Sequence, residues 1–266
     1  MQLRKLVGLA LSLVPILVPS SASSQGTKDQ ARLIFTVSGG VVLGRDLWSV
    51  DKQSVQFITP TDTIALDRRI RSNIAIGFGA TYFPGDALGL AAEGFLLGLG
   101  FEDSCRVVFS SGSADLIAAC QDIQGKTKSA SAVGLSVGPV LRFNSQSAFS
   151  PYLRGNVGLV FSNQSSIRTI GTFPTPDGPS DLIVYDDDHE SRIEAMLGLG
   201  AGFTAQIAPG YQLRWEVRDN ITGVQTVTGP SPVARVIPPH EVSYEHLFSF
   251  TVGFDVVLER KRGRRY

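Results

Sequence analysis

Charged side chains in the middle of alternating segments are the first candidates for a functional role in this sequence. Each segment repeats apolar residues at every second position, and the charges fall among the small and polar residues between them. Because an unpaired ion in a narrow protein interior is costly, enclosed charges of both signs would have to form an ion-pair network. On a soluble protein they would be ordinary solvent-facing residues. The candidates are Glu93, Arg142, Arg154, Glu194, Arg214, Glu216, Arg218 and Asp255.

The two cysteines, Cys105 and Cys120, lie in one long polar segment. In an exported chain such a pair forms a disulfide, which closes the loop and stabilises it by about 3 kcal/mol in the loop-entropy model. The C-x-x-C spacing of redox enzymes is missing. We therefore predict a structural disulfide between Cys105 and Cys120.

The run Asp186-Asp187-Asp188-His189-Glu190 carries ligand types for a hard cation such as calcium. It lacks the spaced ligands and the turn glycine of a calcium loop, which favours a solvated acidic loop end. The three histidines include no pair at helical spacing that would indicate zinc. The sequence accordingly predicts no metal site and no cofactor.

A nucleophile and its base are the remaining chemistry to consider. His246 has Ser243 and Glu245 close in sequence, and a G-x-S-x-G element is missing. Closeness in sequence does not create the hydrogen-bonded geometry that activates a nucleophile. We therefore expect no catalytic residues and no enzymatic activity, with an enzyme kept as an alternative.

The charged candidates are positioned by eight segments with a period of two, which is the pattern of β-strands. In the last segment, phenylalanine and aliphatic residues from Phe248 to Leu258 alternate with small and polar ones. The alternation is weaker in the third segment, where Leu90, Ala92 and Leu96 share one face and Glu93 the other. In the fourth segment Pro139 predicts a bulge or local distortion, because proline cannot donate to the ladder. The predicted strands are Arg32–Leu43, Ile70–Phe83, Leu88–Leu99, Ser129–Phe143, Tyr152–Ser162, Arg192–Ile207, Tyr211–Ile221 and His246–Leu258.

The connections between these strands alternate between long and short. The short ones carry turn chemistry, as in Pro84-Gly85-Asp86 and Ala208-Pro209-Gly210. Membrane barrels have an even number of antiparallel strands, with short turns on one side and long loops on the other. The predicted long loops are Gly44–Arg69, Gly100–Lys128, Asn163–His189 and Thr222–Glu245. A girdle of aromatic residues beside the short turns is predicted from Tyr82, Phe83, Phe143, Tyr152 and Tyr211.

The N-terminus has the composition of a secretory signal peptide. Arg4 and Lys5 precede the apolar run Leu6–Val18, and small residues follow to Ser24. We therefore divide the chain into a signal peptide at 1–24, one barrel domain at 31–258 and a basic tail at 259–266. Charged residues make up 18% of the chain and the formal net charge is zero, which gives no support for a nucleic-acid partner.

With these features together, the chain resembles the small outer-membrane β-barrel proteins of the OmpA-like and OmpX-like type. The resemblance is carried by the signal peptide, the eight-strand rhythm, the segments Pro151–Gly155 and Trp215–Asp219, and the final strand Phe248–Val256. It implies an all-β fold, an eight-stranded antiparallel up-and-down transmembrane barrel, in the bacterial outer membrane. It also implies outer-membrane lipid and the barrel-assembly machinery as partners. In that family the machinery reads a C-terminal aromatic residue, and the last residue here is Tyr266.

The expected function is a structural or surface-interaction role of the adhesion type. The interior of an eight-stranded barrel is about filled by side chains, and the long loops would face an extracellular partner. Three alternatives stay open: a small-solute pore, a lipid A-modifying enzyme like some barrels that resemble this chain, and a soluble secreted lipocalin-like binding barrel. The last stays open because alternation alone does not say which face points outward.

Overall fold

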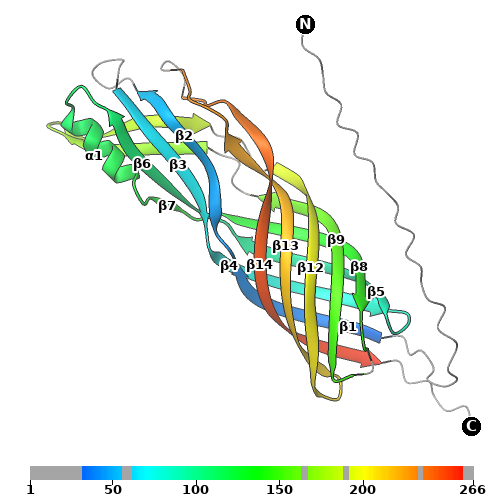
Figure 1. The fold of residues 1–266 in the computed structure, drawn as a ribbon. Coiled ribbons are helices and arrows are strands. Elements are labelled where there is room, and N and C mark those ends of the chain that lie inside the picture. The colour runs from blue at the N-terminus through cyan, green and yellow to red at the C-terminus, as the bar shows by residue number, and fades with distance from the viewer. Residues whose placement is uncertain are drawn as a thin grey trace, which may run out of the picture.

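The computed structural model describes residues 32–55, 62–145, 147–162, 167–187, 192–232 and 236–259. Eight strands close into an antiparallel barrel in which strands that follow one another in the chain are neighbours in the wall (Figure 1). The first of them pairs with both the second and the last, which closes the ring. The predicted eight-stranded up-and-down barrel is confirmed. Its strands are β1 (Arg32–Val42), β4 (Asn73–Phe83), β5 (Leu88–Gly98), β8 (Ser131–Arg142), β9 (Phe149–Ser162), β12 (Arg192–Ala208), β13 (Tyr211–Val227) and β14 (His240–Glu259).

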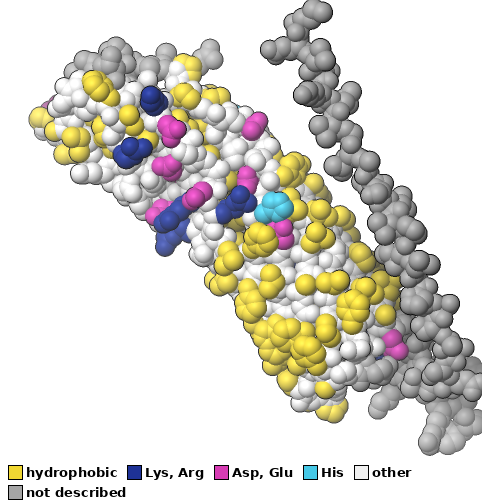
Figure 2. All heavy atoms as spheres, viewed as in Figure 1, with side chains coloured by type: hydrophobic (Ala, Val, Ile, Leu, Met, Phe, Trp, Pro, Cys, Tyr) yellow, Lys and Arg dark blue, Asp and Glu magenta, His cyan; other side chains and the backbone are white. Residues whose placement is uncertain are grey.

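The outer face of the barrel is apolar. Leu135 on β8 is 60% exposed, whereas the next residue, Ser136, is buried in the lumen. Figure 2 shows the apolar side chains forming a belt over the barrel. A closed barrel leaves no unpaired strand edge, so such a surface is compatible with lipid, whereas soluble proteins rarely expose so large a patch. The barrel therefore spans a membrane, and the alternative of a soluble lipocalin-like barrel is wrong.

The two uncertain strand registers are resolved. On β5, Leu90, Ala92 and Leu96 point outward and Glu93 points to the lumen, as predicted. On β8, the ladder to β9 omits Gly138 and Pro139, while the pairs on either side keep one register. Pro139 thus causes a local interruption without a bulge, because only its missing N–H disturbs the ladder.

The prediction of an aromatic girdle at the short-turn end is correct only in part. Tyr82, Phe143 and Tyr211 point outward and are exposed, but Phe83 and Tyr152 are 2% and 3% exposed and lie inside the barrel. Phe83 directly follows Tyr82, and successive residues of a strand point to opposite faces. Two adjacent aromatic residues therefore cannot both face lipid.

The long segments, predicted as loops, are largely ordered into a cap beyond the barrel. We define the cap as the described residues of 45–71, 100–128 and 167–187. A four-stranded sheet in the order β2-β3-β6-β7 continues β1, β4, β5 and β8 in the same order, and β10 and β11 form a separate hairpin (Figure 1). The cap elements are β2 (Arg45–Val55), β3 (Asp62–Arg71), β6 (Gly100–Phe109), α1 (Ala114–Ile123), β7 (Thr127–Lys128), β10 (Ile167–Thr175) and β11 (Gly178–Asp187).

Local signals for the cap elements were present in the sequence. Leu116, Ala119, Cys120 and Ile123 repeat at helical spacing and form the buried face of α1, and the Ser113 side chain accepts a hydrogen bond from the Leu116 amide as its N-cap. In β3 and β2 the inward apolar residues alternate with many charges, which gives these strands the composition of a loop. In the described part of the chain no helix is long and apolar enough to cross a membrane.

The last two barrel strands are longer than predicted. β13 continues past Ile221 to Val227, and β14 begins at His240 instead of His246. The two strands pair along this whole length, from Tyr211 opposite Val256 to Val227 opposite His240. The turn that enters β13 contains Gly210 at a φ of 81°, a backbone conformation that favours glycine.

A charge placed on the outer belt should destabilise the protein. We expect Leu135→Arg to lower the free energy of unfolding by about 2–4 kcal/mol, because arginine would sit in hydrocarbon near the middle of β8. Urea titrations of the protein folded into lipid vesicles measure this change. Ile183→Arg is the control, since Ile183 is exposed on β11 in the cap and should tolerate arginine within about 0.5 kcal/mol. Equal effects of the two substitutions would contradict a belt that faces lipid.

Candidate functional site

The candidate functional site is an ion-pair network that the described residues form in the barrel lumen. β13 contributes Arg214, Glu216 and Arg218, which share the inward face because they are two residues apart. β5 contributes Glu93, and β9 contributes Arg154. β14 adds Asp255, which is fully buried. Six of the eight charges that the sequence proposed for a network thus meet in the lumen, three arginines and three carboxylates.

The ion pairs in this network are short and shared. Glu93 accepts from Nη2 of Arg154 at 2.7 Å and from Nη2 of Arg218 at 2.9 Å. Glu216 accepts from Nε of Arg218 at 2.6 Å and lies 3.5 Å from Nη1 of Arg154. Arg218 therefore bridges two carboxylates, and Arg154 bridges the same two. Such sharing compensates the loss of hydration on both sides of each pair.

A second pair joins the network at β13. Nη2 of Arg214 lies 3.0 Å from Oδ2 of Asp255, and the Thr36 hydroxyl donates to the other oxygen of Asp255 at 2.8 Å. The Tyr152 hydroxyl donates to Glu216 at 2.6 Å. Sequence reasoning missed Thr36 and Tyr152 as network members. Their position on the inward face of β1 and β9 was the available signal, because a buried hydroxyl needs a partner.

Glycine makes room for the network at one close approach. A Cβ atom on Gly77 of β4 would lie 2.8 Å from Oε1 of Glu93 and 2.7 Å from the Ser38 hydroxyl oxygen. Any larger residue at this position would therefore displace the Glu93 carboxylate. The small residues on the inward faces are thus part of the space that the ion pairs require.

Two predicted members lie outside the network. Arg142 is buried near the short-turn end, with its guanidinium carbon 4.6 Å from the centre of the Phe83 ring. Among the described residues, no ion pair reaches Arg142 or Glu194. Glu194 lies on β12 beside Gly223, where a Cβ would meet its Oε2 atom at 2.8 Å. Both residues are on the lumen side but at heights different from that of the network.

Apolar layers close the lumen on both sides of the network. At the short-turn end the buried layer contains Ile34, Phe83, Ala91, Val140 and Tyr152. At the cap end a second layer is built from residues that include Phe95, Leu97, Ala132, Val160, Met196 and Leu247. The cavity between them, beside the ion pairs, has a volume of about 10 Å³. That is space for about one water molecule. Among the described residues, side chains thus fill the lumen at the level of the network and of the two layers.

The cap has a hydrophobic core of its own. Side chains of β2, β3, α1, β10 and β11 are buried together, with Tyr185 among the largest. The Gln53 amide oxygen accepts from the Tyr185 hydroxyl at 2.8 Å and from the Ser231 amide at 2.7 Å. This one side chain therefore ties β2 to β11 and to the connection between β13 and β14.

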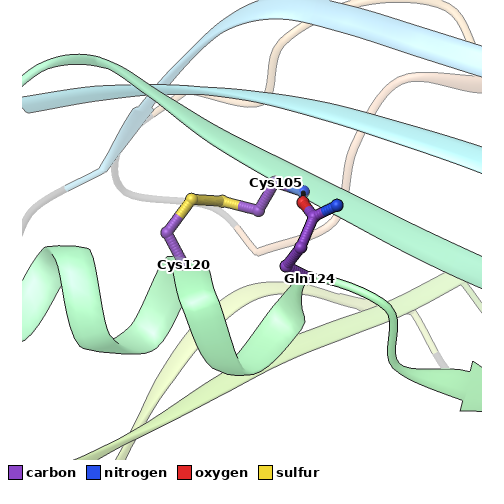
Figure 3. The surroundings of a disulfide bond; sticks show 3 residues. All are labelled: Cys105, Cys120 and Gln124. Atoms are coloured by element: carbon purple, nitrogen blue, oxygen red, sulfur yellow. Dashed lines mark hydrogen bonds between the residues drawn. A yellow bond between two sulfur atoms is a disulfide. The ribbon is translucent and has the colours of Figure 1, made fainter.

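The cysteines lie at the joint between β6 and α1. Cys105 and Cys120 are disulfide-bonded, with their Cα atoms 5.3 Å apart. The Cys105 amide also donates to Oε1 of Gln124 at 2.9 Å, just past the end of α1 (Figure 3). The disulfide therefore fastens the helix to the sheet of the cap, at a position where the sequence predicted only an exposed loop.

A buried ion pair joins β3 to β6 in the cap, two residues from Cys105. The guanidinium of Arg68 binds both oxygens of Asp103, at 2.5 and 2.8 Å, and lies 5.3 Å from the centre of the Trp48 ring. Lys128 Nζ donates to the carbonyl of Arg168. Partial burial, followed by the nearby Arg68 charge, lowers the pKa of Lys128 to about 8. The side-chain hydrogen bond from Lys126 holds the pKa of Asp122 below its usual value.

Among the described residues, His246 is not brought together with Ser243 and Glu245. His246 Nδ1 lies 2.7 Å from Asp219, while Ser243 donates to Glu245 at 2.9 Å. His246 is on the opposite face of β14 from Ser243 and Glu245, because the strand period is two. Within the described residues no three histidine, cysteine, aspartate or glutamate side chains could hold a metal ion.

The described part of the acidic run contacts two basic side chains. Asp186 pairs with Arg168 at 3.1 Å, and Asp187 lies 3.3 Å from His240. The remaining predictions, for Asp188 to Glu190, the signal peptide at 1–24 and all but the first residue of the basic tail at 259–266, lie outside the described residues.

The chain was compared with known families, curated proteins and solved structures. No protein-family model and no curated protein matches the chain. Neisserial surface protein A matches with a TM-score of 0.41 over 85% of this chain and 97% of its own, at 12% identity. OprG of Pseudomonas aeruginosa matches with a TM-score of 0.48 over 87% and 98%, at 12% identity. Ail of Yersinia pestis matches with a TM-score of 0.39 over 87% and 100%, at 12% identity.

All three matches have TM-scores below 0.5 and identities of 12%. The fold is shown by the closed ring of eight strands itself. The comparisons assign no catalytic or ligand-binding residue to this chain.

Removing the central carboxylate of the network should strongly destabilise this barrel. We expect Glu216→Gln to lower the free energy of unfolding by about 3–5 kcal/mol, because Arg218 and Arg154 would lose a buried counter-charge. Urea titration in vesicles again gives the value. The control is Glu102→Gln. Its ion-pair partners Arg69 and Arg71 are exposed, so the free energy of unfolding should change by less than about 1 kcal/mol. A small effect of Glu216→Gln would contradict the network as a stabilising unit.

Removing the disulfide should loosen the cap and leave the barrel intact. For the double variant Cys105→Ser/Cys120→Ser we expect a loss of about 3 kcal/mol in the opening free energy of α1, from the 15-residue separation of the cysteines. Hydrogen exchange of the α1 and β6 amides measures this loss. Barrel amides in β9 and β12 serve as the internal control, and a matching loss there would show that cap and barrel unfold as one unit.

Proposed function

We propose that the protein is a bacterial outer-membrane barrel that does not conduct solutes and that holds its folded cap outside the cell for surface interactions. The observation that carries this proposal is the separation of roles between the two parts. The barrel has a packed lumen, and the cap has its own core and its own disulfide.

The packed lumen supports a structural role over transport. A solute would have to displace Phe83 and Tyr152 at one end, the ion pairs in the middle and Phe95 at the other end. The buried network would have to be hydrated or broken at the same time, which is costly for paired buried charges. The closed lumen is therefore the expected resting state in a membrane.

The connections between the strands support an orientation in which the cap lies outside the cell. β1 begins and β14 ends at the short-turn end of the barrel, and the cap lies at the other end (Figure 1). Outer-membrane barrels keep their short turns in the periplasm and their longer connections outside. An exported chain that the barrel-assembly machinery inserts in this way displays the cap to an extracellular partner.

The absence of enzymatic activity and of a pore stays a prediction. A lipid A-modifying enzyme would change the mass of lipid A in cells that produce the protein. A pore would give conductance steps in planar bilayers. We expect neither.

The proposal is tested by two measurements on one protein. We expect the purified full-length protein to give no conductance steps in planar lipid bilayers. We also expect an epitope inserted between Pro176 and Asp177, in the β10–β11 turn, to bind antibody on intact cells, because that turn lies at the far end of the cap hairpin.

The matched control carries the same epitope between Pro209 and Gly210, in the short turn between β12 and β13. It should bind antibody only after the outer membrane is permeabilised. Labelling of the control on intact cells, or stable conductance steps of the wild type, would refute the proposal.

A further inference from the structure

A polar groove runs along the outer face of the cap sheet, over β2, β3 and β6. It consists of two adjoining hollows with volumes of about 540 and 490 Å³, which share Asp46, Arg69 and Glu102. Because the residues of β3 alternate, Asp67, Arg69 and Arg71 point outward, whereas Arg68 and Ile70 point into the cap. The groove is therefore lined mainly by charged and hydroxyl side chains on the outside of the protein.

The groove begins where the apolar belt ends. Its lower hollow contains Gly44, which directly follows the exposed Leu43, and Arg71, three residues before the exposed Ile74. Three residues of a strand span about 10 Å, or about 7 Å along the membrane normal at the usual strand tilt. Headgroup layers add about 5–7 Å to each side of the hydrocarbon. Figure 2 shows charged side chains gathered just beyond the belt. The lower hollow thus lies at the level of lipid headgroups.

The arginines in the groove have unused hydrogen-bonding capacity. Arg69 and Arg71 are 58% and 53% exposed, and both rely on the one carboxylate of Glu102, at 2.9 and 3.6 Å. Each guanidinium group has five N–H donors, and the single carboxylate of Glu102 engages only some of them. Guanidinium groups bind phosphate oxygens through pairs of N–H donors.

The carboxylates in the groove require a different kind of partner. Asp46 and Asp67 are exposed, and in the ladder between β2 and β3 Asp46 lies opposite Arg69 and Asp67 opposite Ser49. A ligand made only of phosphate would be repelled by them, whereas sugar hydroxyls would donate hydrogen bonds to them. The hydroxyls of Ser49 and Ser104 line the same hollow and can both donate and accept.

We propose that this groove binds the phosphorylated sugar headgroup of an outer-leaflet glycolipid. The phosphate contacts Arg69 and Arg71, and the sugar hydroxyls contact Asp46 and Asp67. The acyl chains run along the apolar belt below, beside Leu43 and Ile74. The inference rests on the outward orientation proposed above, because only then does the groove meet the outer leaflet.

Binding is tested with purified full-length protein by native mass spectrometry, with bisphosphorylated lipid A as the probe. We expect wild type to bind lipid A at least about tenfold more tightly than its dephosphorylated form, since charge-assisted hydrogen bonds are lost. Arg69→Gln/Arg71→Gln should lose about tenfold in affinity for the phosphorylated form only. Glu102→Gln should gain affinity, because both arginines are released from their shared carboxylate.

Arg168→Gln is the matched control. Arg168 is 52% exposed and paired with one carboxylate, as the groove arginines are, but it lies on β10 outside the groove. It should bind lipid A as wild type does. Each variant is first checked for the heat-dependent gel mobility of a folded barrel.

Wild-type affinity of the double arginine variant, or an equal loss for dephosphorylated lipid A, would overturn the proposal. Displacement of lipid A by equimolar glucose 1-phosphate would also overturn it, in favour of a soluble sugar phosphate. These binding measurements do not depend on orientation in cells. A failure here therefore leaves the epitope experiment as the separate test of the proposed function.

Discussion

The closed hydrogen-bond ladder is the constraint on which the rest of the structure depends. Lipid offers no hydrogen-bond partners, so every backbone N–H and C=O of the spanning strands must pair within the protein. β1 meets this requirement by pairing with β4 on one side and with β14 on the other. Once the ring is closed, successive side chains must point alternately to lipid and to the lumen. Each residue type is thereby assigned to one environment by its position in the strand.

The narrow lumen then determines how its charges are arranged. Arg218 and Arg154 each contact Glu93 and Glu216, and Arg214 contacts Asp255. A slip of one residue in any of these strands would turn its charges toward lipid and its apolar residues inward. The ion pairs therefore discriminate against wrong registers, in addition to filling the space between the two apolar layers.

Above the membrane the constraint is relaxed, and the wall opens. The last backbone bond between the first and last barrel strands runs from the Leu43 amide to the Phe248 carbonyl. Beyond this bond, the Arg45 side chain forms an ion pair with Glu245 at 3.0 Å and donates a hydrogen bond to the His246 carbonyl at 3.2 Å. In water the freed strand edges can be hydrated, so β2 is able to leave the ring and join the cap sheet. This divergence lets the cap fold around its own core.

The sequence by itself determined the eight strands, their faces and the residue types in the lumen. Alternation is a local property, so the outward Leu135 and the inward Glu93, Arg214, Glu216 and Arg218 could be predicted without a fold. The same alternation places the adjacent residues Tyr82 and Phe83 on opposite faces of β4. The expected girdle ignored this rule when it included Phe83. The α1 helix also had a local signal, in its helical spacing and the Ser113 N-cap.

Only the tertiary structure decided which charges meet. Glu93 and Arg218 are 125 residues apart, and their contact depends on the stagger of strands around the closed ring. That stagger places Arg154 at the height of the network but leaves Arg142 and Glu194 at other heights. The groove on the cap depends in the same way on the path of β2 after it leaves the ring. Strand faces follow from a period of two along one segment, whereas heights and partners follow from the registers between segments far apart in sequence.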